Sequence, residues 1–133
     1  MIMAIDPGGT TGIAIDFQIE PVPYTLTTST PEELWHIISD AMSQRHQNVV
    51  VLEQFSTGGR LSKDGHYTIE LCGGVKAICH MLGAKLIKHM PQHRIAFLDR
   101  AREMLKEIHS DGYWTEHELD ALAHLLMYQR TGE

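Results

Sequence analysis

The chain has 133 residues, of which 43% are apolar and 21% are charged. This length and balance predict one folded domain over residues 1–133 with a real hydrophobic core, and no stretch approaches the roughly 20 apolar residues that a membrane span needs. The net charge of −6 argues against a general nucleic-acid binder, which usually carries a basic surface. A cluster of metal-binding acids would nevertheless lower the net charge without changing a DNA-facing surface.

The first two predicted strands surround a turn that carries an acid. Residues 2–6 and 11–17 are predicted to form a hairpin around a glycine-rich turn, and the first strand ends in Asp6. An unpaired buried carboxylate is costly, so Asp6 needs a partner, and a metal ion is the strongest candidate. Asp-Pro-Gly is also a common turn sequence, in which Asp6 would have only a structural role. Residues 22–27 are predicted as a third strand at the sheet edge, because prolines flank and interrupt it.

The middle of the chain alternates helix and strand. A capping box that begins at Thr30 predicts the first helix. Residues 48–52 form an apolar run that is typical of a buried, central strand, and this run is followed by a second acid, Glu53. Residues 54–66 are predicted as a loop, and residues 67–82 as an amphipathic helix.

The last part of the chain contains one more strand and two helices. Residues 84–90 are predicted as a strand that stops at a proline, and residues 97–108 as an amphipathic helix. A second capping box, from Thr115, begins the final helix. The whole order predicts an α/β fold with a five-stranded mixed sheet, its first three strands antiparallel, flanked by helices.

Two cysteines indicate the compartment. Cys72 and Cys79 fall on one predicted helix, about 10 Å apart along its axis, which is too far for a disulfide. The N-terminus has no basic region before an apolar core and no cleavage site, so no secretion signal is expected. We therefore expect reduced thiols and a cytoplasmic location.

Three acids are candidates for one metal site. If the first and fourth strands are parallel neighbours, Asp6 and Glu53 emerge side by side, and a helix packed across the sheet could bring Asp120 to them. Three clustered carboxylates raise one another's pKa unless a cation lies between them, and oxygen ligands suit Mg²⁺ or Mn²⁺. Two such ions about 4 Å apart would activate a water and stabilise the leaving oxygen of a phosphodiester. Glu53 could instead be an ordinary acid at a strand end.

The final helix offers further candidates. His117 precedes Asp120 by three positions, so both side chains point to a similar side, and His117 could be a fourth ligand, a proton carrier or a solvated polar residue. We expect the carboxylate of Glu118 to be used by the helix cap, while Glu116 and His124 remain competitors. Asp120 itself could form a structural ion pair, with Arg130 or with Lys106.

Three motifs of the chain resemble those of the RuvC-type Holliday-junction resolvases of the RNase H-like superfamily, in order and spacing over nearly the whole length. They are Asp6-Pro7-Gly8 with Gly12, then Val51-Leu52-Glu53-Gln54-Phe55, then Asp120-Ala121-Leu122-Ala123. The resemblance implies a five-stranded mixed sheet flanked by helices, a homodimer, and divalent-metal cleavage of branched DNA such as four-way junctions. It also implies that Asp6, Glu53 and Asp120 bind the metal, with His117 at a position that is Asp or His in the family.

The same resemblance suggests DNA contacts. The family's aromatic wedge lies three residues after the Glu, whereas Phe55 lies two after it, so Phe55 could be a wedge, a core residue or a dimer contact. Arg94 corresponds to a basic residue after the last strand in the family. Independently of the resemblance, Arg60 and Lys63 lie in a glycine-rich loop next to Glu53 in the sequence, where they could hold phosphates or be solvated charges. The chain is shorter than typical bacterial members, which is similar to a viral or minimal version acting in a host cytoplasm.

Three other functions compete with this hypothesis. Residues 6–12 also look like the phosphate loop of actin-like and sugar-kinase phosphotransferases, but those proteins need two lobes of this fold to enclose ATP. Another RNase H-like nuclease would cut RNA–DNA hybrids instead of junctions. A third possibility is a DNA-binding protein that kept the fold without catalysis.

Overall fold

A computed structural model of the chain describes residues 1–43, 45–54 and 63–133. Its five strands form one mixed sheet in the order β3-β2-β1-β4-β5. β1 pairs antiparallel with β2 and parallel with β4, β2 pairs antiparallel with β3, and β4 pairs parallel with β5. The predicted α/β fold and sheet are thus confirmed. The strands are β1 (Ile2–Asp6), β2 (Thr11–Asp16), β3 (Tyr24–Thr28), β4 (Val49–Glu53) and β5 (Lys85–His89).

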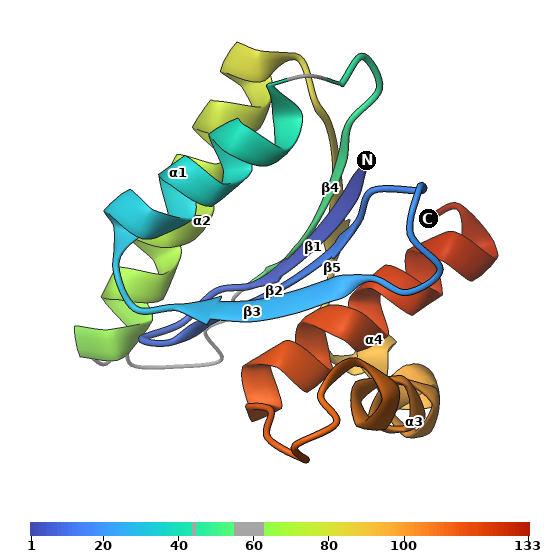
Figure 1. Cartoon of the computed structure of the whole chain (residues 1–133). Helices are drawn as coiled ribbons and strands as arrows, with labels where there is room; N and C mark the ends of the chain where they lie inside the picture. The colour runs from blue at the N-terminus through green and yellow to red at the C-terminus, as the bar shows by residue number, and fades with distance from the viewer. Residues whose placement is uncertain (44, 55–62) are drawn as a thin grey trace.

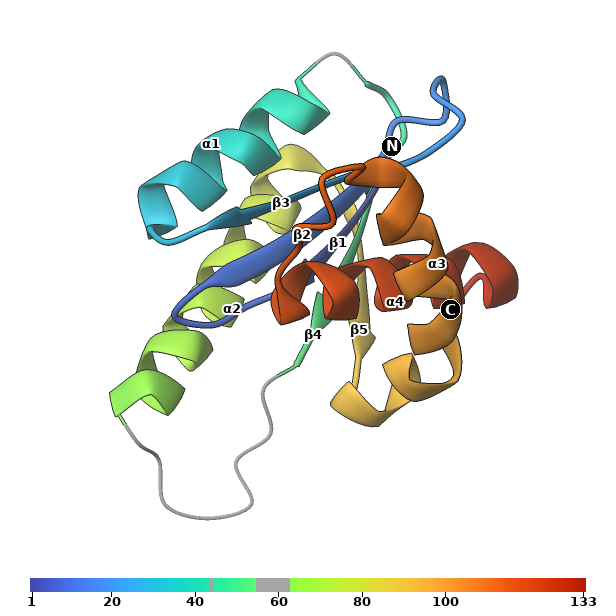
Figure 2. The same ribbon diagram turned by 60° about the horizontal axis from the view of Figure 1, so that its bottom comes forward.

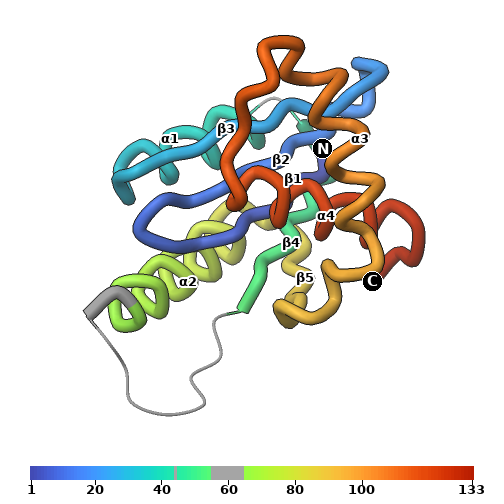
Figure 3. The backbone as a smooth tube through the Cα atoms, turned by 90° about the horizontal axis from the view of Figure 1, so that it is seen from below, coloured from blue at the N-terminus to red at the C-terminus, as the bar shows by residue number. Residues whose placement is uncertain are grey.

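Helices cover both faces of the sheet (Figure 1). The helices α1 (Pro31–Met42) and α2 (Lys63–Leu82) pack on one face, and the 3₁₀ helix η1 (Pro91–Phe97), α3 (Leu98–Ile108) and α4 (Glu116–Thr131) lie on the other, as the view from below also shows (Figure 3). Alternate strand residues feed two cores. Large side chains such as Met3, Ile5 and Ile13 face α1 and α2.

The core beneath α4 is built differently. Ala4 and Ala14, on neighbouring strands, are fully buried there together with Val51. Small side chains at these positions leave little between the helix and the sheet. The fold therefore holds α4 close to the strands, and this closeness brings helix residues to the strand ends.

The final helix begins where its capping box predicts. The hydroxyl of Thr115 accepts a hydrogen bond from the main-chain N–H of Glu118 at 3.1 Å, and the Glu118 carboxylate accepts one from the main-chain N–H of Thr115 at 2.8 Å. The carboxylate of Glu118 is thus engaged in the cap, as expected. This reciprocal cap sets where the helix starts and therefore which residues face the sheet.

Some element boundaries differ from the sequence predictions. β3 begins at Tyr24, two residues later than predicted, because Pro21 and Pro23 cannot donate the hydrogen bonds that pair one strand with the next. α2 begins at Lys63, four residues early, since Gly65 is a buried helical residue and not part of a loop. β4 is an interior strand, but β1 is the central one. η1 was not predicted.

Two features of α2 concern its packing against α1 and its cysteines. Gly74 packs against α1, where a methyl group would overlap the indole of Trp35. Cys72 and Cys79 are both buried on this helix, and no disulfide joins them. No helix in the described parts of the chain is long and apolar enough to cross a membrane.

Candidate active site

Two acids end two neighbouring parallel strands. Ile5 of β1 pairs with Leu52 of β4, and the next residues are Asp6 and Glu53. Parallel strands end at the same edge of a sheet, so the two carboxyl groups emerge side by side, which is the arrangement expected from the sequence. Asp6 is buried at 7% exposure, and the side chain of Glu53 is 13% exposed.

Helix α4 crosses the sheet in front of these strand ends (Figure 2). Its first turn lies directly on β2, because Gly12 has no side chain: a Cβ there would overlap the main chain of His117. Gly12 is also the ladder partner of Asp6. The glycine therefore lets the helix bring His117 to the end of β1.

His117 contacts the first acid directly. Its Nδ1 lies 2.8 Å from Oδ2 of Asp6, and the histidine side chain is 41% exposed. Because an ionised carboxylate can only accept, Nδ1 carries the proton in that state and Nε2 is the ring's second polar atom. The contact orients the imidazole over the glycine-rich turn, where Gly8 is also close to it.

The second acid has a buried histidine as its partner. Nε2 of His124 lies 2.9 Å from Oε2 of Glu53. Nδ1 of the same ring lies 2.9 Å from Nδ1 of His89, at the end of β5. His124 is fully buried and His89 nearly so. Glu53 therefore contacts His124, which in turn contacts His89, so the two rings form a line that leads away from the carboxylate.

The third acid is paired with an arginine. Nε of Arg94 donates to Oδ1 of Asp120 at 2.8 Å, with side-chain exposures of 27% and 21%. Arg94 also donates to the main-chain oxygen of Pro91. The sequence suggested Arg130 or Lys106 as a structural partner for Asp120, but η1 brings Arg94 instead. The contact of Arg94 with DNA that the sequence suggests stays a prediction.

The three acids perturb one another electrostatically. Burial raises the pKa of Asp6 to about 7, and the negative charges of Glu53 and Asp120 add to this rise, while His117 opposes it. Burial also raises the pKa of Asp120, which is opposed by Arg94 and increased by Glu53. These mutual effects mean that the carboxyl groups lie within electrostatic reach of one another.

Glu53 behaves in the opposite way. Burial alone would raise its pKa, but the hydrogen bond and charge of His124 lower it below the ordinary value. The charge of Arg94 and a side-chain hydrogen bond with Asp6 act in the same direction. Of the three acids, Glu53 is therefore the one whose pKa the surroundings lower.

The three carboxylates suit a hard divalent cation, although each of them is paired with a basic side chain in this structure. Among the described residues, no group of three His, Cys, Asp or Glu side chains is arranged to hold a metal ion. The reason is visible in the contacts: Asp6, Glu53 and Asp120 each turn towards a basic side chain. Three carboxylates whose charges oppose one another are nevertheless the oxygen donors that Mg²⁺ and Mn²⁺ prefer, so the residues fit such an ion chemically.

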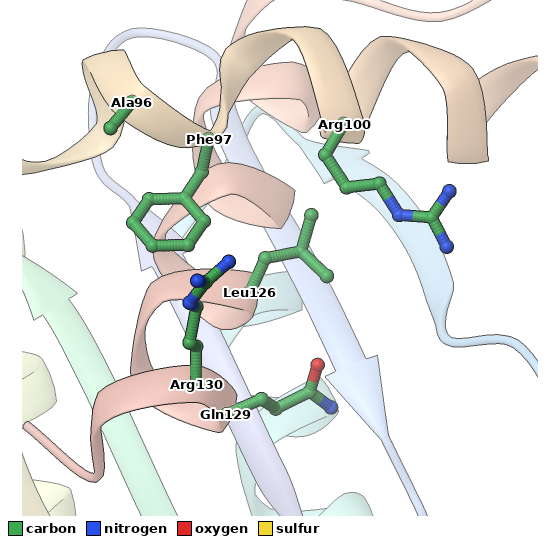
Figure 4. Close-up of a pocket in the computed structure, with 6 residues that line it drawn as sticks. All are labelled: Ala96, Phe97, Arg100, Leu126, Gln129 and Arg130. Atoms are coloured by element: carbon green, nitrogen blue, oxygen red, sulfur yellow. The ribbon is translucent and has the colours of Figure 1, made fainter.

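Other candidate residues lie outside this cluster. Phe55 and Arg60 fall outside the described residues, and Lys63 is described only as the first residue of α2. A groove of about 500 Å³ lies between the segment 96–100 and the end of α4 (Figure 4). It is lined by Ala96, Phe97, Arg100, Leu126, Gln129 and Arg130, so none of the three acids contributes to it.

Sequence reasoning missed the role of two histidines. The sequence patterns gave no role to His89, and they left His124 only as a competitor of His117. A signal was present for His124, which lies four residues after Asp120 and seven after His117, on the same helix face. A histidine between the buried residues Ala123 and Leu125 needs a hydrogen-bond partner.

Comparison with known proteins identifies the fold. No protein-family model and no curated protein sequence matches the chain. Among solved structures, it is similar to Thermus thermophilus RuvC in complex with a Holliday junction substrate, with a TM-score of 0.71 and 15% identity over 99% of this chain and 97% of that one. A second Thermus thermophilus RuvC structure matches with a TM-score of 0.60 and 17% identity, over 98% and 96% of the two chains. The chain thus has the RuvC, RNase H-like fold that its motifs resemble.

Proposed function

We propose that the chain is a divalent-metal-dependent endonuclease that cleaves phosphodiester bonds in Holliday junctions and related branched DNA, with residues 1–133 acting as one nuclease domain. The observation that carries this proposal is the convergence of Asp6, Glu53 and Asp120, from three distant parts of the sequence, at one end of a RuvC-like sheet. One structure with this fold is of RuvC in complex with a Holliday junction substrate, which suggests the substrate class.

In this proposal Asp6, Glu53 and Asp120 hold Mg²⁺ or Mn²⁺, two ions in the complete site. A bound divalent cation would supply Lewis-acid activation of water and neutralise charge at the phosphate. The protein's own contribution is to keep three carboxyl groups together before any ion binds. Arg94 and His124 do this by placing positive or hydrogen-bonding groups against Asp120 and Glu53.

His117 has a role that follows from its orientation. Its Nδ1 is used by Asp6, so Nε2 is the atom that acts, either as a further ligand or as a carrier of a proton to or from the substrate. The ring is 41% exposed, so this atom can reach a bound phosphate. The hydrogen bond to Asp6 fixes the direction in which it does so.

DNA binding in this proposal uses Arg60, Lys63 and Arg94 for phosphates, and Phe55 for the branch point. Phosphate contacts make binding sensitive to salt. The double variant R60A/K63A is expected to bind junctions more weakly and with a flatter salt dependence, by about one unit of log–log slope for each lost contact. An unchanged slope would remove these side chains from the DNA-binding surface.

We also propose that two copies of the chain form a twofold dimer. A four-way junction must be cut in two symmetric strands, and a dimer presents two equivalent sites for this. Light scattering on the purified chain, alone and with a synthetic junction, measures the assembly. A single copy on each junction would contradict the dimer without touching the nuclease chemistry.

The direct test is cleavage of labelled synthetic four-way junctions, linear duplex and RNA–DNA hybrid, each with Mg²⁺, Mn²⁺ or EDTA. We expect cleavage of the junction only, and only with a divalent ion. Cleavage of the hybrid alone would assign the chain to another class of RNase H-like nuclease. Stabilisation by ATP without cleavage of any substrate would favour a phosphotransferase.

A matched pair of variants tests the assignment of the site. Asp120→Asn keeps the shape of the side chain and removes its charge, so cleavage in Mg²⁺ should be lost while junction binding is retained. Asp40→Asn makes the same chemical change on the exposed face of α1 and should leave both properties unchanged. Full cleavage by the Asp120→Asn protein would refute the role of this carboxylate.

A further inference from the structure

A line of hydrogen bonds runs from the second acid into the protein interior. His124 contacts Oε2 of Glu53 through Nε2 at 2.9 Å, and the two Nδ1 atoms of His124 and His89 lie 2.9 Å apart. Nε2 of His89 then lies 2.7 Å from the main-chain oxygen of Glu133. The proposed cleavage uses Glu53, but nothing in it yet explains the two buried rings behind that residue.

The donors at the two ends of this line follow from the acceptors. Each hydrogen bond requires one proton between its two heavy atoms. The main-chain oxygen of Glu133 can only accept, as the ionised carboxylate of Glu53 does, so Nε2 of His89 and Nε2 of His124 are the donors there. The roles of the two Nδ1 atoms depend on the tautomers of the rings.

We propose that His124 and His89 are positioning residues that fix Glu53 as an oriented carboxylate in the metal-binding cluster, with the main-chain oxygen of Glu133 securing the outer end of the line. This relay is defined as Glu53, His124, His89 and the oxygen of Glu133. It fixes the direction of the Glu53 carboxylate because each of the two rings is held by the next member of the line.

The surroundings support this assignment. His124 is fully buried on α4 beside apolar residues such as Leu122 and Leu125, where an imidazole without partners would be costly. The hydrogen bond and charge of His124 lower the pKa of Glu53 against the effect of burial. His89 is nearly fully buried as well, so it needs its contacts with His124 and Glu133 in the same way.

The outer end of the relay reaches the surface. His89 and Glu133 line a groove of about 600 Å³ beside β5, together with Lys85 and Lys88. The relay therefore connects the edge strand and the end of α4 to a carboxylate in the cluster. Residues that align the outer ring should act on Glu53 without touching it, as outer partners of metal ligands do.

The hydrogen-bond pattern can be measured in the metal-free protein. Long-range ¹H–¹⁵N spectra of the histidine rings report which ring nitrogens are protonated. We expect a proton on Nε2 of His89, which faces the main-chain oxygen of Glu133, and a proton on Nε2 of His124, which faces the Glu53 carboxylate. A His124 ring without a proton on Nε2 does not donate to Glu53, and this result would overturn the proposal.

The positioning role is tested by metal affinity and by rescue. His124→Leu removes the donor to Glu53, and we expect the dissociation constant for Mn²⁺, measured by calorimetry, to rise at least about tenfold. His124→Gln places an amide N–H near the position of Nε2 and should recover most of this loss. His89→Leu should weaken Mn²⁺ binding by about threefold or more, although His89 does not contact the acids.

The exposed His80 of α2 supplies the control, since His80→Gln should leave Mn²⁺ affinity unchanged. Native Mn²⁺ affinity in both leucine variants would overturn the positioning role. If the leucine variants do not fold, the ring spectra of the unaltered protein still decide. The positioning role rests on the proposed function, but the spectra do not: a chain that shows the expected ring protons and cleaves no DNA would retain the relay and lose the nuclease assignment.

Discussion

Replacing Asp6 by Asn should stabilise the metal-free protein. In the folded chain the pKa of Asp6 is raised from 3.8 to about 7, first by burial and then by the charge of Glu53. Each pKa unit corresponds to about 1.4 kcal/mol, so a rise of about three units amounts to about 4 kcal/mol when the group is ionised in both states. Because Glu53 shares part of this interaction, we expect the Asn variant to gain about 2–4 kcal/mol in the free energy of unfolding.

The pH dependence of this gain has a definite sign. Below about pH 4 the Asp6 carboxyl is protonated in both the folded and the unfolded chain, so the Asn substitution gains nothing by removing its charge. Between about pH 4 and 7 the folded chain holds a proton that the unfolded chain has lost, and the native protein loses stability relative to the variant as pH rises. Above about pH 7 the difference is complete.

Urea denaturation in EDTA, followed by circular dichroism at about pH 4 and pH 8.5, measures this difference. The matched variant Asp40→Asn, at an exposed position of α1, should show the same small effect at both pH values. If Asp6→Asn gains no more stability at the higher pH than at the lower one, the buried carboxyl of Asp6 is not held against its own charge and the reasoning is wrong.

Adding Mn²⁺ should cancel most or all of the advantage in stability that the Asn variant has over the native protein. A ligand that binds only the folded state stabilises it by about 2.7 kcal/mol at a concentration one hundred times its dissociation constant. The native protein should gain in this way, whereas the Asn variant lacks a ligand and should gain much less. Equal stabilisation of both proteins by Mn²⁺ would place the ion elsewhere.

Two further predictions concern Gly12, which lets His117 reach Asp6, and Arg94, which pairs with Asp120. Gly12→Ala puts a methyl group into the main chain of His117 and should reduce the free energy of unfolding by about 1–3 kcal/mol, while Gly9→Ala, with open space at its Cβ, should change it little; thermal unfolding compares the two, and equal losses would refute the close approach. Arg94→Gln removes the partner that opposes the raised pKa of Asp120, so the carboxyl carbon of Asp120 should titrate at higher pH by NMR, whereas an unchanged midpoint would contradict the ion pair.

The strands of the sheet and the acids Asp6 and Glu53 could be predicted from the sequence because each is indicated by residues that are close together in the chain. An apolar run that ends in an acid identifies a strand and its last residue at once, as for Asp6 and Glu53. Two capping boxes located the starts of α1 and α4 for the same reason, since the residues that form a cap are three positions apart. The parallel pairing of β1 with β4 entered the sequence argument only as a condition, although an alternation of helix and strand favours such a pairing.

The partners of the acids were not accessible in this way. Arg94 reaches Asp120 because η1, an element without a clear sequence signal, turns the chain after β5. His89 and His124 meet because α4 is rotated about its axis so that His124 faces His89 at the end of β5. Such contacts depend on how a helix is seated on a sheet, and the seating depends on small residues such as Ala4, far away in the sequence.

The seating of α4 has a simple geometric basis. The seven residues from His117 to His124 advance the helix by about 10.5 Å, and the two strand spacings from β1 to β5 amount to about 9.6 Å. A helix that crosses the strands therefore presents one residue of the same face to the end of β1 and another to the ends of β4 and β5. An inserted residue between these histidines would turn one of them by about 100° away from its strand end. The separation of His117 and His124 along the helix therefore has to fit the spacing of the strands. Asp6 and Glu53 both have a histidine partner because it does.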